Sequence, residues 1–459
     1  MRPKVSVYIT CHNYGQYVTQ AIDSVFYQLF EDWELLIIDD GSSDNSLEII
    51  KNKAKAYPDK VRVISNKVSK GLPVCANIAI EESKGEYIIR LDADDFFDES
   101  AILTMSTFLD KHKEISLVYP NYVYVDECGN YLGTERRKKI GHEVKVLDLP
   151  AHGACTMVRK RVLKSIGGYD TGHNAQDGHQ IWLKILNRYK ISNITTPLFF
   201  YRQHKESLTT DNQRILSARK NIKRSMVKKH KGSVSTHVVG VIPAKNIDKS
   251  MPNICLNKIG GKPLIDYSIE AAMNSSLLDD ILISTDDQLV VDYCSKKFAN
   301  IKVYLRPKGL SERSVMLPEV MLDATNYLED QLNISLDIVV MLNVLSPLRV
   351  SSDIDEAVDT LLLYDVDSVT SVYEDHELHF THGKFGLEPL NKGAMNQIFL
   401  ERESLFVDNN SVKAFWRDVL SSDTLHGMTY GHFVMPKFRS YRIQDKSTFC
   451  IIENLIKTL

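Results

Sequence analysis

Long apolar runs are missing from this chain of 459 residues. A helix that crosses a bilayer needs about 18 or more apolar residues in a row, and the sequence contains no such run. The start Met1-Arg-Pro-Lys leads directly into the strand-like VSVYIT, without the apolar segment of a secretory signal. These absences predict a cytoplasmic protein that is neither secreted nor embedded in a membrane.

Cysteine is also scarce. The seven cysteines are odd in number and widely spaced, and no two of them form a CxxC pair. This pattern disfavours a disulfide framework and a zinc module, and it favours a reducing compartment.

An excess of charge of one sign is missing as well. Lys plus Arg (56) against Asp plus Glu (59) gives a net charge of −3. Because the chain has no overall positive charge, we expect no nucleic-acid partner. Any recognition based on charge must then depend on local clusters of charged residues.

Short apolar runs do alternate with amphipathic stretches. This alternation predicts βα units around a mainly parallel sheet. The expected strands are VSVYI, ELLIID, VRVIS and YIIRLD, and the expected helices between them lie over residues 17–30, from Asn45 and through Ala79. In the first predicted helix the apolar residues fall at helical spacing and should face the core. This stripe consists of Val18, Ile22, Val25, Phe26 and Leu29.

A basic segment separates two such patterns. Residues 219–231 carry seven Lys or Arg and no acid, and a new α/β pattern begins at HVVGVIPA. We therefore predict two α/β domains, residues 1–232 with a basic linker at about 215–232 and residues 233–459. The linker is interpreted either as a solvated helix face between domains or as a site for anionic lipid, which keeps peripheral attachment to the inner face of a membrane open.

Acidic clusters follow two of the predicted strands in the first half. Asp39-Asp40-Gly41-Ser42-Ser43-Asp44 comes after ELLII, and Asp92-Ala93-Asp94-Asp95 comes after YIIRL. Ligands of open parallel sheets bind outside the carboxyl ends of the strands, so both clusters should face one crevice. Adjacent carboxylates suit Mg²⁺ or Mn²⁺, which in turn can bind a departing diphosphate. The alternative is a pair of acidic turns that only cap helices.

The first half resembles the family 2 glycosyltransferases of GT-A type over about residues 3–210. The resemblance rests on VSVYITCHNYGQYVTQAIDSVFYQ, WELLIIDDGSSDNS, KGLPVCANIAI, KGEYIIRLDADD and IGGYD…AQD. It implies that Thr10 and Asp40 hold the nucleotide base of the donor. It also implies that Asp92 and Asp94, with Asp95 beside them, address the ribose, the diphosphate and the metal.

The same resemblance implies that Asp177 is the general base. An inverting transfer needs a carboxylate that deprotonates the acceptor hydroxyl as it attacks, although Asp177 could equally cap the helix that follows it. Arg202 and His204, in the segment YRQH, are candidates for contacting the diphosphate. Two family positions differ here, because Gln176 replaces a Glu and Ala76 replaces an Arg.

The second half resembles the CMP-N-acylneuraminate synthetases, a cytidylyltransferase family, over about residues 237–375. The resemblance rests on IPAKNIDKSMPNICLNKIGGKPLIDYSIEAA, DILISTDD, VYLRP, DIVVMLNVLSPLR, DIDEAV and DSVTSV. Both halves would then be tandem Rossmann-like domains of the nucleotide-diphospho-sugar transferase kind. Lysines in a loop at a strand end can neutralise a triphosphate, or they can simply be solvated. The nucleotide or sugar pocket is predicted at Lys245, Lys249, Arg306, Asn343 and Arg349.

Departures from that family affect its chemistry. Lys245 replaces an Arg, and the metal-binding Asp-x-Asp of the family aligns with Arg442-Ile443-Gln444, with only Asp445 nearby. A cation cannot replace a carboxylate that binds a metal. We therefore expect the second domain to keep its fold but to have weak or altered cytidylyl transfer.

The leading prediction is a metal-dependent inverting glycosyltransferase of surface polysaccharide synthesis. It would use a nucleotide-sugar donor, a saccharide or glycolipid acceptor, and Mg²⁺ or Mn²⁺. The alternatives are a bifunctional enzyme that also uses CTP, and a scaffold protein of a glycan assembly complex. A homo-oligomer formed through the second domain is a further prediction about partners.

Overall fold

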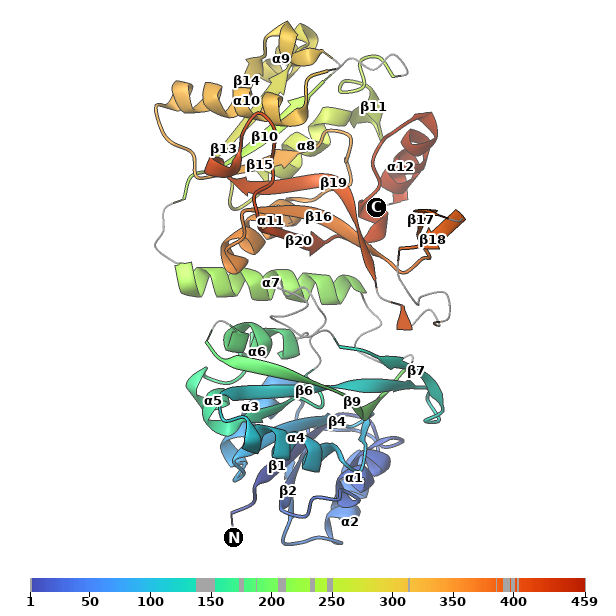
Figure 1. Ribbon diagram of the computed structural model, residues 1–459. Coiled ribbons are helices and arrows are strands. Elements are labelled where there is room, and N and C mark those ends of the chain that lie inside the picture. Colours follow the sequence, from blue (N-terminus) through green and yellow to red (C-terminus); the bar gives the residue numbers. More distant parts are fainter. Residues whose placement is uncertain are drawn as a thin grey trace. The chain divides into compact units, whose positions relative to one another are not determined.

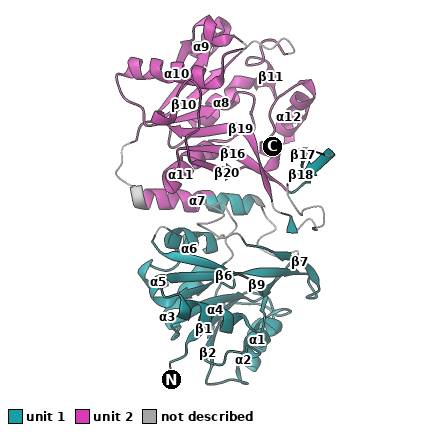
Figure 2. Cartoon of the chain, in the orientation of Figure 1, with its two compact units in different colours: residues 1–219, 376–403 teal, residues 220–375, 404–459 magenta. Residues whose placement is uncertain are grey.

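The computed structural model describes residues 2–137, 153–172, 177–186, 188–204, 212–231, 236–245, 251–312, 314–384, 386–390, 397, 401–402 and 404–458. The chain divides into two compact units (Figure 2). Unit 1 comprises residues 1–219 and 376–403, and unit 2 comprises residues 220–375 and 404–459.

Unit 1 is built on a mixed sheet in the order β3-β2-β1-β4-β8-β6-β9-β5, with β7 paired to β6 (Figure 1). The strands β1, β2, β3 and β4 are mutually parallel neighbours, and β8 joins them antiparallel. Their bounds are β1 Val5–Cys11, β2 Trp33–Asp39, β3 Val61–Ser65, β4 Tyr87–Asp92, β5 Phe96–Phe97, β6 Ile115–Val125, β7 Tyr131–Glu135, β8 Met157–Arg159 and β9 Lys190–Arg202. The apolar runs of β1 and β2 are buried along their length, as expected for central parallel strands.

The helices of this part of the chain follow the strands. Their bounds are α1 Val18–Phe26, α2 Ser46–Ala54, α3 Leu72–Glu82, α4 Ala101–Lys111, α5 Lys160–Ser165, α6 Asp177–Leu186 and α7 Asn212–Lys231. In α1 the predicted stripe is buried at Val18, Ile22 and Val25. Leu29 was expected to join it, but α1 ends at Phe26 and Leu29 is 59% exposed.

Unit 2 has a second mixed sheet in the order β14-β13-β10-β15-β19-β16-β20. The strands β14, β13, β10 and β15 are parallel neighbours, and β19 joins them antiparallel. The bounds are β10 Val238–Ala244, β13 Asp280–Thr285, β14 Lys302–Leu305, β15 Ile338–Leu342, β16 Ser368–Asp375, β19 Leu405–Trp416 and β20 Tyr430–Val434. A small hairpin of unit 2 lies outside its main sheet, β11 Lys258–Ile259 with β12 Lys262–Pro263. A second hairpin, β17 Phe380–Gly383 with β18 Gly386–Pro389, lies in the segment that groups with unit 1.

Helices of unit 2 are α8 Leu264–Met273, α9 Gln288–Lys297, α10 Leu317–Leu332, α11 Ser351–Tyr364 and α12 Lys446–Thr458, with short 3-10 turns at Lys308–Ser311, Arg417–Val419 and Lys437–Arg439. The core includes Met321, Ala324 and Leu328 of α10, which pack with Val239 and Val339 of the sheet. The prediction of two tandem α/β regions is confirmed.

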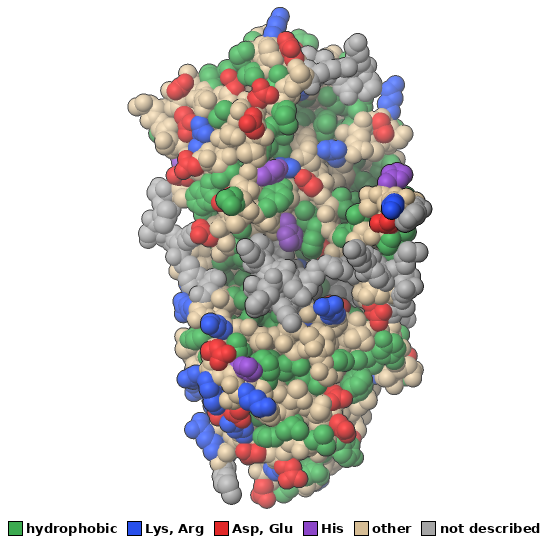
Figure 3. Space-filling view, in the orientation of Figure 1, with side chains coloured by type: hydrophobic (Ala, Val, Ile, Leu, Met, Phe, Trp, Pro, Cys, Tyr) green, Lys and Arg blue, Asp and Glu red, His purple; other side chains and the backbone are tan. Residues whose placement is uncertain are grey.

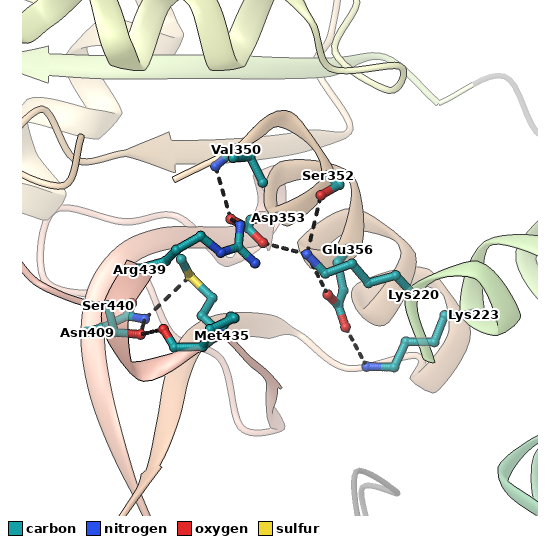
Figure 4. Close-up of polar contacts among 11 residues, drawn as sticks. Lys220, Lys223, Val350, Ser352, Asp353, Glu356, Asn409, Met435, Arg439 and Ser440 are labelled. Carbon is teal, nitrogen blue, oxygen red and sulfur yellow. Dashed lines mark hydrogen bonds and ion pairs between the residues drawn. The ribbon is translucent and has the colours of Figure 1, made fainter. Parts of the chain in front are cut away.

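The basic segment forms the second part of α7, and its charges pair with α11 inside unit 2 (Figure 4). The pairs are Lys220 Nζ to Asp353 Oδ1 at 2.5 Å, Lys223 Nζ to Glu356 Oε1 at 3.3 Å, and Arg224 Nη1 to Asp359 Oδ1 at 3.0 Å. Arg439 reaches the other oxygen of Asp353 at 2.6 Å. We call Lys220, Lys223 and Arg224 the basic face of α7.

These pairs are largely removed from water. The Lys223 side chain is 1% exposed and that of Glu356 is 3% exposed. Burial raises the pKa of Asp359 to about 6, although the nearby Arg224 lowers it. The cations of the basic face of α7 are therefore committed to α11, whereas Lys228 and Lys229 of the same basic segment are exposed. The two compact units separate at residues 219 and 220, inside α7 and before the predicted boundary at residue 233. Residues 220–231 group with unit 2, the unit that contains their partners on α11.

Throughout the described residues, no helix is both long and apolar enough to cross a membrane.

Candidate active site

The strand register of unit 1 brings the two acidic clusters to one edge of the sheet. Thr10 pairs with Ile38 of β2 on one side and with Asp92 of β4 on the other. Asp40 follows directly after β2, and its amide donates to the carbonyl of Cys11 at 2.8 Å. Thr10, Asp40 and Asp92 thus lie at the carboxyl edge of adjacent parallel strands, where α/β sheets bind their ligands.

Asp40 organises the loop that leads into α3. Its carboxylate accepts hydrogen bonds from Asn66 Nδ2 at 2.8 Å, Ser69 Oγ at 2.8 Å and the amide of Gly71 at 2.8 Å. Burial alone would raise its pKa, but these bonds and that from the Lys70 amide lower the pKa to about 2. The carboxylate of Asp40, predicted to hold the nucleotide base, therefore already accepts several hydrogen bonds from its own chain.

Asp92 ends β4 and is held by an arginine of the same strand. Arg90 Nε donates to Asp92 Oδ1 at 2.5 Å, and its Nη2 donates to Oδ2 at 2.9 Å. Arg90 is buried, so the pair is a charge-assisted fork in a poorly hydrated setting. The sequence prediction did not include Arg90. Its position two residues before Asp92, on the same face of the strand, was the available signal.

Asp94 meets His204, which follows β9. The Nε2 atom of His204 lies 2.9 Å from Asp94 Oδ2. The rings of Tyr14 and Tyr17 pack around the imidazole, with centroids 5.9 and 5.2 Å away. Residues 94 and 204, far apart in sequence, therefore form a carboxylate–imidazole pair beside the acidic turn.

Asp95 is the buried member of the acidic turn. Its Oδ1 accepts the Arg202 amide at 2.9 Å, whereas its Oδ2 has no hydrogen-bond partner among the described residues. Burial raises its pKa well above the usual value, and the charges of Asp94 and Asp92 raise it further. The raised pKa favours the protonated, neutral form of Asp95, so its carboxyl can stay buried without a cation.

This arrangement fits a divalent cation that the protein ligates only in part. No three His, Cys, Asp or Glu side chains of the described residues form a complete metal site. Asp94 Oδ2 and His204 Nε2 offer a hard oxygen and an imidazole, and such partial sites take their remaining ligands from phosphate oxygens or water.

Arg202, predicted as a diphosphate contact, instead supports the loop beyond β6. Its guanidinium donates to the carbonyls of Asp94, Asp126 and Glu127 and to Gln20 Oε1, at 2.6 to 3.2 Å. The side chain is 2% exposed and lies over the ring of Tyr17. These bonds make Arg202 a structural residue that positions the backbone of Asp94.

Asp177 is the first residue of α6, but its side chain lies outside what the structure describes, as does Gln176. The helix is anchored by Trp182, which is 1% exposed and packs edge-on against Tyr119 with centroids 4.7 Å apart. The backbone position at a helix start is compatible with either predicted role of Asp177.

Two of the residues predicted for the second pocket, Arg306 and Arg349, form hydrogen bonds within unit 2. Arg306 donates to Ser311 Oγ and the Ser284 carbonyl at 3.0 and 2.9 Å, and it is 3% exposed. Arg349 donates to the carbonyls of Asn343 and Ser411 and to Ser268 Oγ. Burial lowers the pKa of Arg349 to about 10. Both arginines therefore bind backbone and hydroxyl groups of their own fold.

Lys245 and Asn343 do lie at the carboxyl edge of this sheet, after β10 and β15. Lys245 is exposed and its Nζ donates to the Glu312 carbonyl at 3.2 Å, whereas Lys249 lies outside the described residues. Asp445 caps α12, because its Oδ1 accepts the Thr448 amide at 2.8 Å. The single carboxylate near the position of the family's metal ligands is thus used at a helix start.

Comparison with family models finds two successive matches along the chain. Residues 6–167 match the model described as "Glycosyl transferase family 2", and residues 239–452 match "Cytidylyltransferase". The chain joins a family 2 glycosyltransferase region to a cytidylyltransferase-like region. Both resemblances and the predicted enzyme class are thereby confirmed.

Curated relatives match the glycosyltransferase region. The putative glycosyltransferase EpsE of Bacillus subtilis is 27% identical over 213 residues, which is 45% of this chain and 75% of that protein. The chondroitin synthase of Pasteurella multocida is 37% identical over 131 residues, 28% of this chain but only 13% of the relative.

Solved structures are more distant from the glycosyltransferase region. Staphylococcus aureus TarS 1–349 has a TM-score of 0.40 at 18% identity, and the match covers 49% of this chain and 65% of that one. The mannosyltransferase PcManGT of Pyrobaculum calidifontis, in complex with GDP-Man and Mn²⁺, has a TM-score of 0.39 at 15% identity, with coverage of 50% and 65%.

Proposed function

We propose that the chain is a metal-dependent inverting glycosyltransferase of surface polysaccharide synthesis. It would move a sugar from a nucleotide-sugar donor to a hydroxyl of a saccharide or glycolipid acceptor. The observation that carries the proposal is the acidic turn after β4, where Asp92, Asp94 and Asp95 crowd together and one buried oxygen of Asp95 lacks a partner among the described residues. The family match and the similarity to a chondroitin synthase support a saccharide acceptor.

The donor side of the site is the carboxyl edge of β1, β2 and β4. Asp94 and His204 would hold Mg²⁺ or Mn²⁺, which supplies positive charge that stabilises the departing nucleoside diphosphate. Arg90 keeps Asp92 in a fixed orientation, and Arg202 fixes the backbone of Asp94. Asp95 is buried at this turn, where its Oδ1 accepts the Arg202 amide.

The acceptor side requires a base, and we assign it to Asp177. Its carboxylate takes the proton of the acceptor hydroxyl while the hydroxyl oxygen attacks the anomeric carbon. The bond from that carbon to the diphosphate oxygen breaks on the opposite face, so the configuration inverts and the nucleoside diphosphate leaves with the bonding electrons. The start of α6 favours the charged form of such a carboxylate.

The decisive test is a screen of nucleotide sugars for metal-dependent hydrolysis and transfer by the full chain. Asp94→Asn should lower turnover by about two orders of magnitude or more and should raise the metal concentration needed for half-maximal activity. Asp59→Asn is the matched control, because Asp59 is an exposed residue of the same unit. Full, metal-independent activity of Asp94→Asn would refute the assignment.

For the cytidylyltransferase-like region we propose a retained fold with weak or altered cytidylyl transfer. The support is that Asp445 caps α12 while Arg442 and Gln444 stand where the family has carboxylates. Calorimetry of CTP with Mg²⁺, on a chain carrying Asp94→Asn to silence the other region, should show little metal-dependent binding. Tight binding together with pyrophosphate release in the presence of a nonulosonic acid would establish the bifunctional alternative instead.

A further inference from the structure

A basic groove lies at the amino edge of the unit 1 sheet, away from the acidic turn. It has a volume of about 830 Å³. The groove is formed where β1, β2 and β4 begin and where the antiparallel β8 ends. Its lining residues are Arg2, Pro3, Lys4, Asp32, Gly85, Glu86, Lys113, Arg159, Lys160, Arg161 and Lys164. Seven of these are Lys or Arg and two are acidic.

Several of these cations already have carboxylate partners. Lys4 Nζ lies 2.9 Å from both Glu86 and Asp110, and Lys164 Nζ lies 3.0 Å from Glu81. Lys113 contacts Asp110 at 3.5 Å. Arg159 is buried, and it donates to backbone carbonyls and approaches Glu86 at 3.5 Å. These side chains form the walls of the groove rather than free binding groups.

Three cations lack a carboxylate partner among the described residues. Arg2 Nε donates to the Lys84 carbonyl at 2.6 Å, and Lys160 Nζ donates to the Ser83 carbonyl. Arg161 is exposed, at the start of α5. Figure 3 shows Lys and Arg side chains gathered on this side of unit 1. Burial lowers the pKa of Lys160, and the positive charges of Lys164 and Arg2 lower it further. The groove therefore holds positive charge that its own carboxylates do not balance.

We propose that this groove binds a phosphate-bearing ligand through Arg2, Lys160 and Arg161. Two guanidinium forks and one ammonium match the several acceptor oxygens of a phosphate group better than the two oxygens of a carboxylate. A concave groove receives a discrete phosphate group, such as a diphosphate or a lipid headgroup. Because the parallel strands run from this edge to the acidic turn, the site is separate from the proposed donor site.

Calorimetry with inorganic diphosphate on the full chain tests the proposal. EDTA is included so that diphosphate cannot bind through a metal at the acidic turn. The wild type should bind, and Lys160→Ala/Arg161→Ala should weaken binding by about tenfold or more, since the double variant removes two of the three cations that form charge-assisted hydrogen bonds to the phosphate. Lys228→Ala/Lys229→Ala removes two exposed lysines of α7 and should leave affinity unchanged.

Arg161→Glu serves as a second variant, because an exposed side chain can be reversed in charge without disturbing the fold. Flotation with phosphatidylglycerol vesicles, against phosphatidylcholine vesicles, identifies the source of the phosphate. Flotation that Arg161→Glu abolishes indicates a lipid headgroup, and diphosphate binding without flotation indicates a soluble phosphate compound. The proposal is overturned if the wild type binds no diphosphate, or if both groove variants bind it as tightly as the wild type.

Discussion

Each carboxylate of the acidic turn has a different partner. Asp92 is paired with Arg90 of its own strand, Asp94 with His204 after β9, and Asp95 with the amide of Arg202. Separate partners and the raised pKa of Asp95 allow three carboxyl groups to share one turn. Asp94 differs from Asp92 because its partner is the imidazole of His204 and not an arginine.

The assignment of Asp177 as the base predicts a separation of binding from turnover. Asp177→Asn keeps size and hydrogen-bonding capacity but cannot accept the proton, so the rate of transfer should fall by about 10²–10⁴-fold. Donor binding, measured by calorimetry with metal present, should stay within about twofold of the wild type because the residue does not contact the donor in this mechanism. An equal loss of binding and turnover would instead indicate a donor contact.

The low pKa of Asp40 predicts a pH-dependent contribution to stability. The pKa is about 2 in the folded chain and 3.8 without its partners, so the stabilisation is present above pH 4 and is lost as pH falls toward 2. Asp40→Asn should lower the free energy of unfolding of unit 1 by about 2 kcal/mol at pH 7, and the difference from wild type should shrink in acid. Urea titrations followed by tryptophan fluorescence in a Trp416→Phe background would report this, because Trp33 and Trp182 both belong to unit 1.

Asp59→Asn is the control for that series and should change stability by no more than about 0.5 kcal/mol. A pH-independent effect of Asp40→Asn would show that the hydrogen bonds from residues 66–71 do not depend on the charge of Asp40.

The sequence was sufficient to place the acidic residues at strand ends, because alternating apolar runs define the strands and parallel pairing aligns their carboxyl ends. It was not sufficient to assign partners. Arg202 and His204 are two residues apart, yet one supports the backbone and the other meets Asp94. The β6–β9 register that places them is a long-range pairing, which local patterns do not encode.

Elements with strong periodicity were predicted well, and their ends less so. The helix expected from Asn45 is α2, and the helix expected through Ala79 is α3. The first helix stops earlier than its apolar spacing suggests, because the Leu29 amide bonds the Glu99 carbonyl instead of continuing the helix. The charge pattern was the least reliable guide. The basic face of α7 was expected to be solvated, because its acidic partners on α11 lie more than 100 residues later in the chain.

At the level of these two helices, we predict that Lys223→Ala loosens α7 from α11. Among the described residues it leaves the buried Glu356 with Lys220, 3.5 Å away, as a compensating charge. Breaking such a pair should cost about 3 kcal/mol and speed amide hydrogen exchange in both helices. The double variant Lys223→Met/Glu356→Met should recover most of the loss, because well-packed apolar residues can replace a buried pair. Unchanged exchange in Lys223→Ala would contradict the importance of the pair.

At the scale of the whole molecule, the two regions are joined by a helix that belongs structurally to both. Residues 212–219 of α7 group with unit 1, and residues 220–231 group with unit 2. The segment 376–403 also groups with unit 1, although residues on both sides of it group with unit 2. A cut at residue 233 would follow the composition of the sequence but would remove from unit 2 the cations that pair with Asp353, Glu356 and Asp359.

This division predicts how fragments of the second half behave. A fragment of residues 212–459 retains the basic face of α7, whereas a fragment of residues 233–459 exposes the acidic residues of α11 without their partners. Losing about 3 kcal/mol should lower the melting temperature of the shorter fragment by roughly 6–12 °C, as followed by the fluorescence of Trp416, the tryptophan that unit 2 contains. Lys228→Ala/Lys229→Ala in the longer fragment should leave its melting temperature unchanged, since those lysines are exposed. Equal melting temperatures for the two fragments would place the boundary at residue 233 after all, because α7 would then act only as a connection and not as part of unit 2.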